Sequence, residues 1–343
     1  MKDRGHTIYL YAHERSNADC DVLIPVTDDS ILAEAYGEFN WKENQFKHNT
    51  GDFAQLTFNK NAIREISKHK KSGDFLLCFW GIGHQPIAMA HQDLIAVEPG
   101  VGYHMGLFAS YRVFESYSVR DIAYEKMGWG NPDWNDAVIP NYFDSNDFDY
   151  QEKKEDYFLY IGRLIKNKGI EIAMQASTRA GVKLIIAGQG NFKELFPKSP
   201  ANVEFVGFAD VDTRRSLLSK AAGLYVPSLY VEPFGGVMIE AFLSGTPVIS
   251  TDWGSFAENN LHGITGYRCR NMEQFVWATK NIKNIKPSVC REWAENFTLE
   301  RVSKMYEEYF NSLHRLKNKG GWYHENPERT ELDWMKLSYP KKC

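Results

Sequence analysis

Short apolar runs alternate with amphipathic stretches along most of the chain. In the first half, residues 59–71 and 110–127 have the spacing of helices. Strands that alternate with helices are typical of βαβ units with a parallel sheet, so this half is predicted to be a Rossmann-like domain of the α/β class. Its five expected strands, rich in apolar and β-branched residues, begin at Thr7, Asp21, Asp74, Asp93 and Asp136.

A second alternating series follows the polar, acidic segment 144–156, which is interpreted as a linker. A helix is expected over 169–180, and apolar residues recur at helical spacing over 300–316. The pattern predicts a domain over 1–143, a second Rossmann-like domain over 144–299, and a final helix with a tail over 300–343. The five strands expected in the second domain begin at Tyr157, Val182, Val203, Ala222 and Thr246.

Composition and charge narrow the function classes. Forty Lys and Arg against 44 Asp and Glu leave too little net charge for a surface that binds nucleic acid generally. No apolar run approaches the roughly 18–20 residues of a membrane span, and the first residues lack the apolar run of a signal peptide. The five cysteines form no C-x-x-C pair and have no nearby His at metal-ligand spacing, so neither a disulfide framework nor a zinc site is encoded. We expect a cytoplasmic protein.

The strongest chemical signal is the segment 222–251, where a strand, a glutamate, a Pro-Phe-Gly-Gly run, a helix and another strand follow one another. A helix that begins near Gly235 leaves amide groups without helical partners, and these suit an anion. Glu232 precedes this helix and Glu240 lies inside it. Their separation, about 10 Å from the helical rise, is near the span from ribose to sugar in a nucleotide sugar. The alternative is a surface helix with two solvated acids.

Two further strand ends carry residues suited to a phosphate. Gly162 and Arg163 end one strand, and Lys168 follows before the next helix. Ligands bind at the carboxyl ends of strands in open α/β sheets, where two cations can neutralise a diphosphate. Gly188 and Gly190 form a G-x-G at the tip of the next strand, a weak signal because such glycines often serve turn geometry alone. The alternative for the two cations is a solvated turn.

The order of these motifs over residues 158–266 resembles the family-four retaining glycosyltransferases of GT-B fold. The matching motifs are G-R-L at 162–164, A-G-x-G at 187–190, V-x-F-x-G at 203–207, E-P-F-G at 232–235 and G-T-P-V-I at 245–249. The resemblance implies two Rossmann-like domains facing across a cleft. It also implies transfer of a sugar, with retention, from a nucleoside-diphosphate sugar to a glycan or lipid-linked acceptor, with no cofactor and no essential metal.

The resemblance also implies roles for single residues. Arg163 and Lys168 correspond to the residues that contact the diphosphate, Glu232 to the residue that contacts the transferred sugar, and Glu240 to the ribose binder. The backbone amides that surround the donor sugar and its phosphate correspond to Phe234, Gly235 and Gly236.

The first half departs from the family pattern. The family has an opening strand and Gly-rich loop before an R-G-H turn, whereas Arg4, Gly5 and His6 stand almost at the start of this sequence. We therefore expect that unit to be absent and the first domain to be shortened. This leaves open a catalytically inactive nucleotide-sugar-binding partner or scaffold. A sugar-nucleotide epimerase of the same fold is a further alternative, which the E-P-F-G-G context disfavours.

Three residues are candidates for the acceptor side. Glu98 stands at a predicted strand end, where a carboxylate of suitable pKa can act as the acceptor's general base or polariser, and His84 and His104 stand near strand ends. The alternative for each is a loop residue that caps local amides. Basic residues gathered over 60–71 raise the possibility of peripheral contact with an anionic membrane, against a solvated helix. The sequence does not identify the donor base, the acceptor or the oligomeric state.

Overall fold

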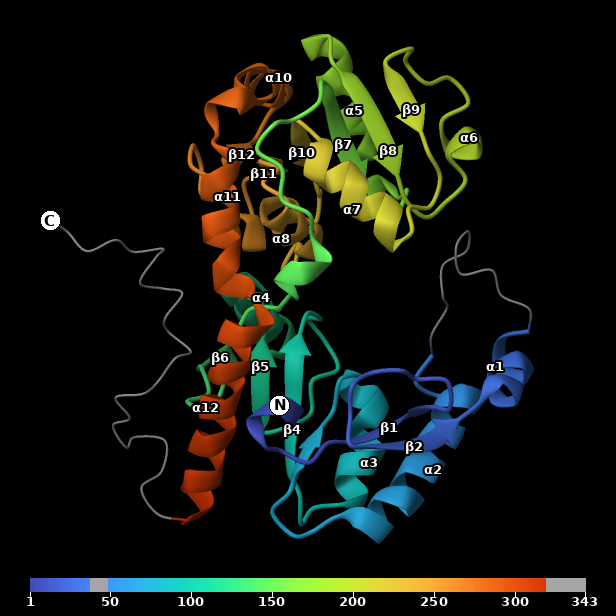
Figure 1. The fold of residues 1–343 in the computed structure, drawn as a ribbon. Coiled ribbons are helices and arrows are strands. Elements are labelled where there is room, and N and C mark those ends of the chain that lie inside the picture. The colour runs from blue at the N-terminus through green and yellow to red at the C-terminus, as the bar shows by residue number, and fades with distance from the viewer. Residues whose placement is uncertain (38–48, 319–343) are drawn as a thin grey trace, which may run out of the picture.

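The computed structural model describes residues 1–37 and 49–318. Two α/β halves lie one above the other, and the chain passes between them after β6 (Ala137–Val138) and again along α12 (Leu299–Asn318) (Figure 1). Every strand pairing described is parallel. The predicted α/β class is confirmed.

A six-stranded parallel sheet forms the centre of the second half, in the order β12-β11-β10-β7-β8-β9. Five of its strands begin within two residues of the positions expected from the apolar pattern, while β12 was not predicted. The chain order reverses between β10 and β7, which are hydrogen-bonded neighbours. The strands are β7 (Tyr157–Ile161), β8 (Lys183–Ala187), β9 (Val203–Phe205), β10 (Gly223–Val226), β11 (Val248–Thr251) and β12 (Gly266–Cys269).

Helices cover both faces of this sheet. The strand order runs one way from β7 to β9 and the other way from β10 to β12, so right-handed crossovers place α5 and α8 on opposite faces. The helix α10 packs against α5, and α11 packs against α8. The helices are α5 (Ile170–Ala180), α6 (Phe192–Leu195), α7 (Val211–Lys220), α8 (Gly236–Leu243), α9 (Ser255–Asn259), α10 (Met272–Asn281) and α11 (Pro287–Ala294).

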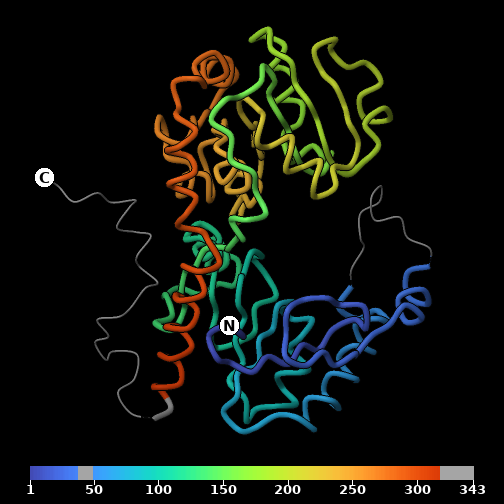
Figure 2. The backbone as a smooth tube through the Cα atoms, viewed as in Figure 1, coloured from blue at the N-terminus to red at the C-terminus, as the bar shows by residue number. Residues whose placement is uncertain are grey.

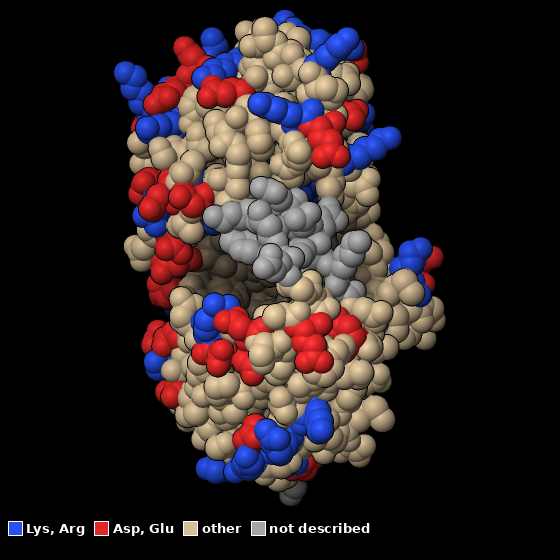
Figure 3. Space-filling model, turned by 90° about the vertical axis from the view of Figure 1, so that its right-hand side faces the viewer, with Lys and Arg blue, Asp and Glu red and all other residues tan. Residues whose placement is uncertain are grey.

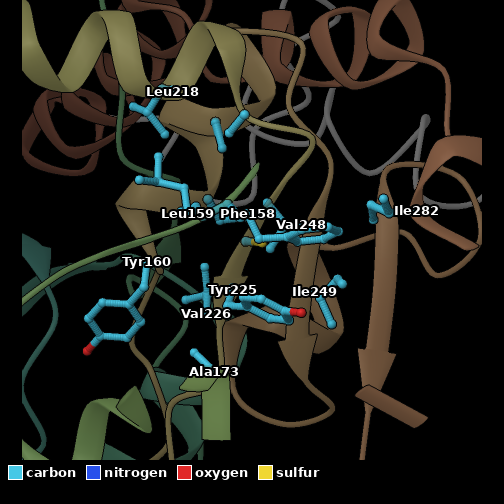
Figure 4. Packing of buried hydrophobic residues seen from close by; sticks show 14 of the residues in the cluster. Phe158, Leu159, Tyr160, Ala173, Leu218, Tyr225, Val226, Val248, Ile249 and Ile282 are labelled. Carbon is cyan, nitrogen blue, oxygen red and sulfur yellow. The ribbon is translucent and has the colours of Figure 1, made fainter. Parts of the chain in front are cut away.

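The central strands are buried on both faces, which explains why their sequences read as continuous apolar runs. Leu159 of β7 and Val248 of β11 are fully buried. Leu218 of α7 and Ala173 of α5 approach the strands from opposite sides (Figure 4). This packing gives the carboxyl ends of β7 and β10 a rigid base.

The first half contains a four-stranded sheet in the order β3-β4-β5-β6 and a separate parallel pair, β1-β2. The predicted single sheet is therefore divided. The pair packs through its own small core, in which Ile24 and Val26 meet Ala62 and Ile66 of α2. The elements are β1 (Tyr9–His13), β2 (Val22–Thr27), α1 (Asp29–Tyr36), α2 (Phe53–His69), β3 (Phe75–Leu77), α3 (Gln85–Ala90), β4 (Ile95–Val101), β5 (Tyr111–Phe114) and α4 (Tyr117–Met127).

Two predicted helices were wrong at their starts: the one expected over 59–71 is α2, which begins at Phe53, and the one expected over 110–127 begins only at Tyr117. Residues 111–114 form β5 between β4 and β6, and α4 begins only after Ser116, whose side chain accepts a hydrogen bond from the amide of Val119. Val113 and Phe114 are fully buried in β5. Burial inside a sheet, a tertiary effect, overrides the local helical spacing.

The predicted final helix is confirmed as α12. It runs along the first half, as the tube in Figure 2 shows, and buries Val302, Met305 and Leu313 in the core of that half. Near the start of α12, the segment that enters the second half lies beside the segment that leaves that half. The amide of Phe143 donates to the carbonyl of Phe297, and the amide of Leu299 donates to the carbonyl of Phe143. The two halves are joined by these adjacent segments.

Candidate functional site

A cavity of about 240 Å³ lies at the carboxyl ends of β7 and β10. These are the neighbouring strands between which the chain order reverses, the place where open α/β sheets bind ligands. On a larger scale, Figure 3 shows the surface of the molecule hollowed between the two halves. The cavity brings together six of the residues expected at the site, namely Gly162, Arg163, Lys168, Glu232, Gly235 and Gly236.

Two of the residues that line the cavity, Lys168 and Glu232, form an ion pair. The Lys168 ammonium lies 2.8 and 2.9 Å from the two carboxylate oxygens of Glu232. The Ser228 hydroxyl donates a further hydrogen bond to Glu232, at 2.8 Å. The side chains are 22% and 10% exposed, so the pair is largely shielded from water. Sequence analysis expected both residues but not their contact, nor Ser228.

Close backbone packing positions Lys168. The next residue, Gly169, has a φ of 70°, and a Cβ atom there would lie 1.9 Å from the carbonyl oxygen of Pro227. Only glycine allows this approach. The turn that carries Lys168 is thereby held against the end of β10, where the chain leads to Ser228 and Glu232.

The backbone of Glu232 is held by the loop after β11. The amide of Ser255 donates to the Glu232 carbonyl at 3.1 Å. A Cβ atom on Gly254 would lie 2.9 Å from the Glu232 nitrogen, so this approach also requires glycine. The Tyr230 ring lies 5.0 Å from the Lys168 ammonium, and burial, together with the nearby Glu232 charge, raises the pKa of its hydroxyl.

The start of α8 lines the cavity through Gly235, Gly236 and Val237. Gly235 precedes the helix with a φ of 78°, and a Cβ atom there would meet the Phe256 ring at 2.7 Å. Amides in the first turn have no earlier helical carbonyl to bond and carry partial positive charge. The Phe234 side chain is buried against Phe143 and Phe297, so it anchors the loop. This arrangement suits an anion beside Glu232.

Glu240, one turn into α8, is not among the residues that line this cavity. Its side chain is 13% exposed, with one oxygen 3.5 Å from Arg214 and the other, Oε2, buried without a hydrogen-bond partner in the part of the chain described. Burial raises the pKa of this carboxyl, and the Arg214 charge opposes the shift. An unpartnered buried oxygen costs free energy unless a ligand satisfies it.

The glycines of the G-x-G motif serve backbone packing. A Cβ atom on Gly188, whose φ is 155°, would lie 1.8 Å from the Gly162 oxygen. One on Gly190 would lie 3.0 Å from the Leu164 Cβ atom. Neither glycine lines the cavity. They bring the loop after β8 against the loop that carries Arg163.

The three acceptor-side candidates lie elsewhere in the first half. Glu98 is fully buried within β4 and accepts hydrogen bonds from the Tyr103 hydroxyl and from the amides of Phe108 and Ala109, at 2.9 to 3.0 Å. Burial raises its pKa, and these bonds oppose the shift. Glu98 therefore caps the amides of the loop after β4, which is the alternative that the sequence analysis gave for this residue.

The two histidines are not among the residues that line the cavity either. His84 stacks on Phe58 with ring centroids 5.5 Å apart. His104 follows β4, and its Nδ1 atom is buried with no hydrogen-bond partner in the described part of the chain. Their acceptor roles stay predictions.

A contact between the halves was not predicted. The Glu258 carboxylate on α9 accepts hydrogen bonds from the amides of Tyr117 and Ser118 at 3.0 and 2.8 Å, and from the Ser118 hydroxyl at 2.6 Å. It thus caps α4 of the opposite half, where the helix dipole favours a negative charge. About 140 residues separate the partners, so no local pattern could have indicated the contact.

Three further observations concern metal-ligating residues, membrane-spanning helices and the basic segment 60–71. Within residues 1–37 and 49–318, no group of three or more His, Cys, Asp or Glu is placed to hold a metal ion. No helix in the described ranges is long and apolar enough to cross a membrane. On α2 and just after it, Glu65 pairs with Arg64 and Lys68, and Asp93 pairs with Lys70, which offsets much of the basic charge noted in the sequence.

Comparison with known sequences finds a family match in the second half and relatives that match parts of the chain. Residues 143–298 match the family model Glycosyl transferases group 1. An uncharacterised glycosyltransferase of Methanocaldococcus jannaschii is 32% identical over 140 residues, 37% of this chain and 36% of that protein. The chain thus matches only about a third of that relative. The phosphatidyl-myo-inositol mannosyltransferase of Mycobacterium tuberculosis is 28% identical over 305 residues, 78% of this chain and 75% of that protein.

Comparison with solved structures concerns the whole architecture. The crystal structure of Anabaena HepE in complex with UDP superposes with a TM-score of 0.63, 19% identity, and coverage of 76% of this chain and 83% of that one. AviGT4, a glycosyltransferase involved in avilamycin A biosynthesis, gives a TM-score of 0.55 at 22% identity over 64% of this chain and 68% of that one. At these identities the likeness establishes the fold.

Proposed function

We propose that this chain, whose second half matches the group 1 glycosyl transferases and whose fold is GT-B, is a retaining family-four glycosyltransferase. It moves a sugar from a nucleoside-diphosphate sugar to a hydroxyl group of a glycan or lipid-linked acceptor, without an essential metal. The observation that carries the proposal is the cavity at the reversal of strand order, which joins two cations, a carboxylate and the start of α8.

The diphosphate is the part of the donor that this cavity suits best. Arg163 is exposed at its edge, Lys168 lies inside it, and the first-turn amides of Gly236 and Val237 face the same space. Charge that develops on a departing diphosphate is stabilised by such preorganised donors. A diphosphate that approaches Lys168 would share its ammonium with Glu232, which keeps the Ser228 hydrogen bond.

The two glutamates suit the two sugars of the donor. Glu232 orients the transferred sugar and stabilises positive charge as the bond to the diphosphate breaks. Glu240 accepts hydrogen bonds from ribose hydroxyls through its unpartnered oxygen Oε2. The acceptor hydroxyl then attacks the anomeric carbon from the face that the diphosphate leaves, and a phosphate oxygen receives the hydroxyl proton. Front-face attack of this kind retains the anomeric configuration.

Relatives and neighbours suggest which substrates to try first. HepE structures contain UDP and UDP-glucose, so a uridine diphosphate sugar is the first donor to test. The mycobacterial relative is named for mannose transfer to phosphatidyl-myo-inositol, which supports a trial of lipid acceptors. Both substrate choices are part of the proposal.

The test is a panel of UDP, GDP and ADP sugars, in which thermal stabilisation and release of nucleoside diphosphate are measured with and without a chelator. We expect one donor to be cleaved above the rate without enzyme, and the chelator to change nothing. Glu232→Gln and Arg163→Ala should each lower the release, whereas the exposed counterparts Glu204→Gln and Arg179→Ala should not.

Three outcomes contradict parts of the proposal. Unchanged release in both site variants refutes the site. Binding without release, with every acceptor tried, favours the inactive donor-binding partner. An epimerised nucleotide sugar in the absence of an acceptor favours the epimerase.

A further inference from the structure

One carboxylate of the first half lies within electrostatic reach of Glu232 and has no part in the roles above. Glu115 directly follows β5, so it stands at the carboxyl end of the four-stranded sheet. A Cβ atom on Gly102, at the end of the neighbouring β4, would lie 2.8 Å from the Glu115 Oε2 atom. Glycine at 102 therefore leaves the space that the carboxylate occupies.

The surroundings of Glu115 lead toward the donor cavity. The Asn141 side chain hydrogen-bonds its carboxylate, and two residues later the Phe143 ring lies 3.5 Å from the Cβ position of Gly236, at the start of α8. Glu115 is also close enough to interact electrostatically with Tyr306 of α12 and with the Glu232 carboxylate of the opposite half, and Tyr142 interacts in turn with Tyr306. Burial, and then the Glu232 charge, raise the pKa of Glu115.

A chain of hydrogen bonds fixes Glu115 relative to Glu232. The α9 helix holds the Glu232 carbonyl through the amide of Ser255 at its first residue. Through Glu258, one turn later, the same helix holds the amides of Tyr117 and Ser118, two and three residues after Glu115. The short helix α9 thus forms hydrogen bonds with the backbone near Glu115 of the first half and with the backbone of Glu232 of the second half.

We propose that Glu115 is the catalytic residue of the first half, whose carboxylate accepts a hydrogen bond from the attacking hydroxyl and orients it toward the anomeric carbon. This inference rests on the proposed glycosyltransferase function. A polarising carboxylate of this kind is one of the roles for which sequence analysis considered Glu98, which the fold instead uses inside β4. Glu258 is a positioning residue that acts through the backbone at 117–118.

The transfer step balances without a further reactant. A bond forms between the acceptor oxygen and the anomeric carbon, and the bond from that carbon to the phosphate oxygen breaks. The electron pair of the broken bond stays on the diphosphate, and the acceptor proton passes to a phosphate oxygen. The single proton of the acceptor hydroxyl is hydrogen-bonded to Glu115 as attack begins and moves to the phosphate oxygen as the bond to the anomeric carbon forms, so Glu115 is a carboxylate before and after the step.

The test uses hydrolysis of the donor, in which water replaces the acceptor hydroxyl. The full chain is assayed with UDP-, GDP- and ADP-glucose without added acceptor, and the donor that is hydrolysed fastest is kept. Wild type, Glu115→Gln and Glu115→Ala are compared with Glu125→Gln, the same change at an exposed position of α4. Donor Kd, kcat, the melting temperature and the pH profile of kcat are measured for each.

We expect Glu115→Gln to leave the donor Kd within twofold and to lower kcat about tenfold, with a larger loss in Glu115→Ala, because the amide oxygen of Gln still accepts a hydrogen bond. The pKa of Glu115 is raised, so protonation should lower the wild-type kcat at a pH above the usual glutamate range, and Glu115→Gln should lack this acid limb. Glu258→Gln should lower kcat with the acid limb retained.

Each result decides between the inferences. If Glu115→Gln keeps kcat within twofold of wild type, or if Glu125→Gln loses as much, Glu115 has no such role while the proposed function stands. A weakened donor Kd in Glu115→Gln with unchanged kcat also overturns the role. If the wild-type protein hydrolyses none of the donors and releases no nucleoside diphosphate with any acceptor tried, the proposed function fails and the role of Glu115 fails with it.

Discussion

The Lys168–Glu232 pair permits a test of how far the cavity shields charge. The Lys183–Glu204 pair joins β8 and β9 at the same nitrogen-to-oxygen distance, 2.8 Å. The first pair is 22% and 10% exposed and the second 51% and 53%. The chain therefore contains two lysine–glutamate pairs of equal length that differ mainly in their contact with water.

The expected magnitudes follow from the difference in exposure. At 2.8 Å, the attraction between unit charges is about 6 kcal/mol at an effective dielectric constant of about 20 and about 1.5 kcal/mol in bulk water. Desolvation offsets much of the larger figure, and side-chain entropy with salt screening offsets most of the smaller one. We expect a coupling energy of about 1–3 kcal/mol for Lys168–Glu232 and below about 0.5 kcal/mol for Lys183–Glu204.

The assay is a double-mutant cycle on urea unfolding at neutral pH and low salt. In each pair the lysine is changed to Met and the glutamate to Gln, singly and together. Each cycle therefore compares the wild type, two single variants and one double variant. Added salt should reduce the coupling of Lys183–Glu204 and leave that of Lys168–Glu232 largely intact. Equal coupling energies in the two pairs, or equal salt dependence, would show that the cavity does not shield its charges.

Three further outcomes follow from the site. Arg163→Ala should weaken donor binding by about 10- to 100-fold in calorimetry, since a hydrogen bond to a charged group is worth about 1.5–3 kcal/mol. The unfolding midpoint of this variant should stay unchanged because the Arg163 side chain is exposed. A shifted midpoint with full donor binding would contradict this prediction. Burial raises the pKa of Glu240, so its contribution to stability is present at acid pH and is lost as the pH rises through the raised pKa. Glu240→Gln should therefore melt above wild type at pH 7 and lose that gain near pH 4, and an equal gain at both values would refute the shift. Gly188→Ala should lower the free energy of urea unfolding by more than about 3 kcal/mol, because its Cβ atom would overlap the Gly162 oxygen. Gly181 has a φ of 74° and open space around it, so Gly181→Ala should lower that free energy by only about 1–2 kcal/mol, from backbone strain alone. Similar losses in the two variants would rule out the overlap.

Local patterns were sufficient where one short segment carries both a fold element and its chemistry. The strand, loop and helix of the second half, with Glu232 and the glycines at the start of α8, follow one another in the chain, and the apolar pattern placed them within two residues. Arg163 and Lys168 were found for the same reason, since each follows a strand end directly. In the first half the same approach read β5 as part of a helix, because the four residues of that strand carry too short a pattern to show their burial.

The sequence by itself determined the α/β class, the two-part organisation and the residues that surround the strand ends of the second half. These features depend on periodicity and on neighbours in the chain, which a single sequence contains. Only the tertiary structure decided that Lys168 and Glu232 form a shielded pair and that Glu98 binds the amides of a neighbouring loop. It also decided that α9 holds the backbone near both Glu115 and Glu232. Such relations depend on the packing of segments up to about 140 residues apart, and burial, which sets their electrostatics, exists only once the chain has folded.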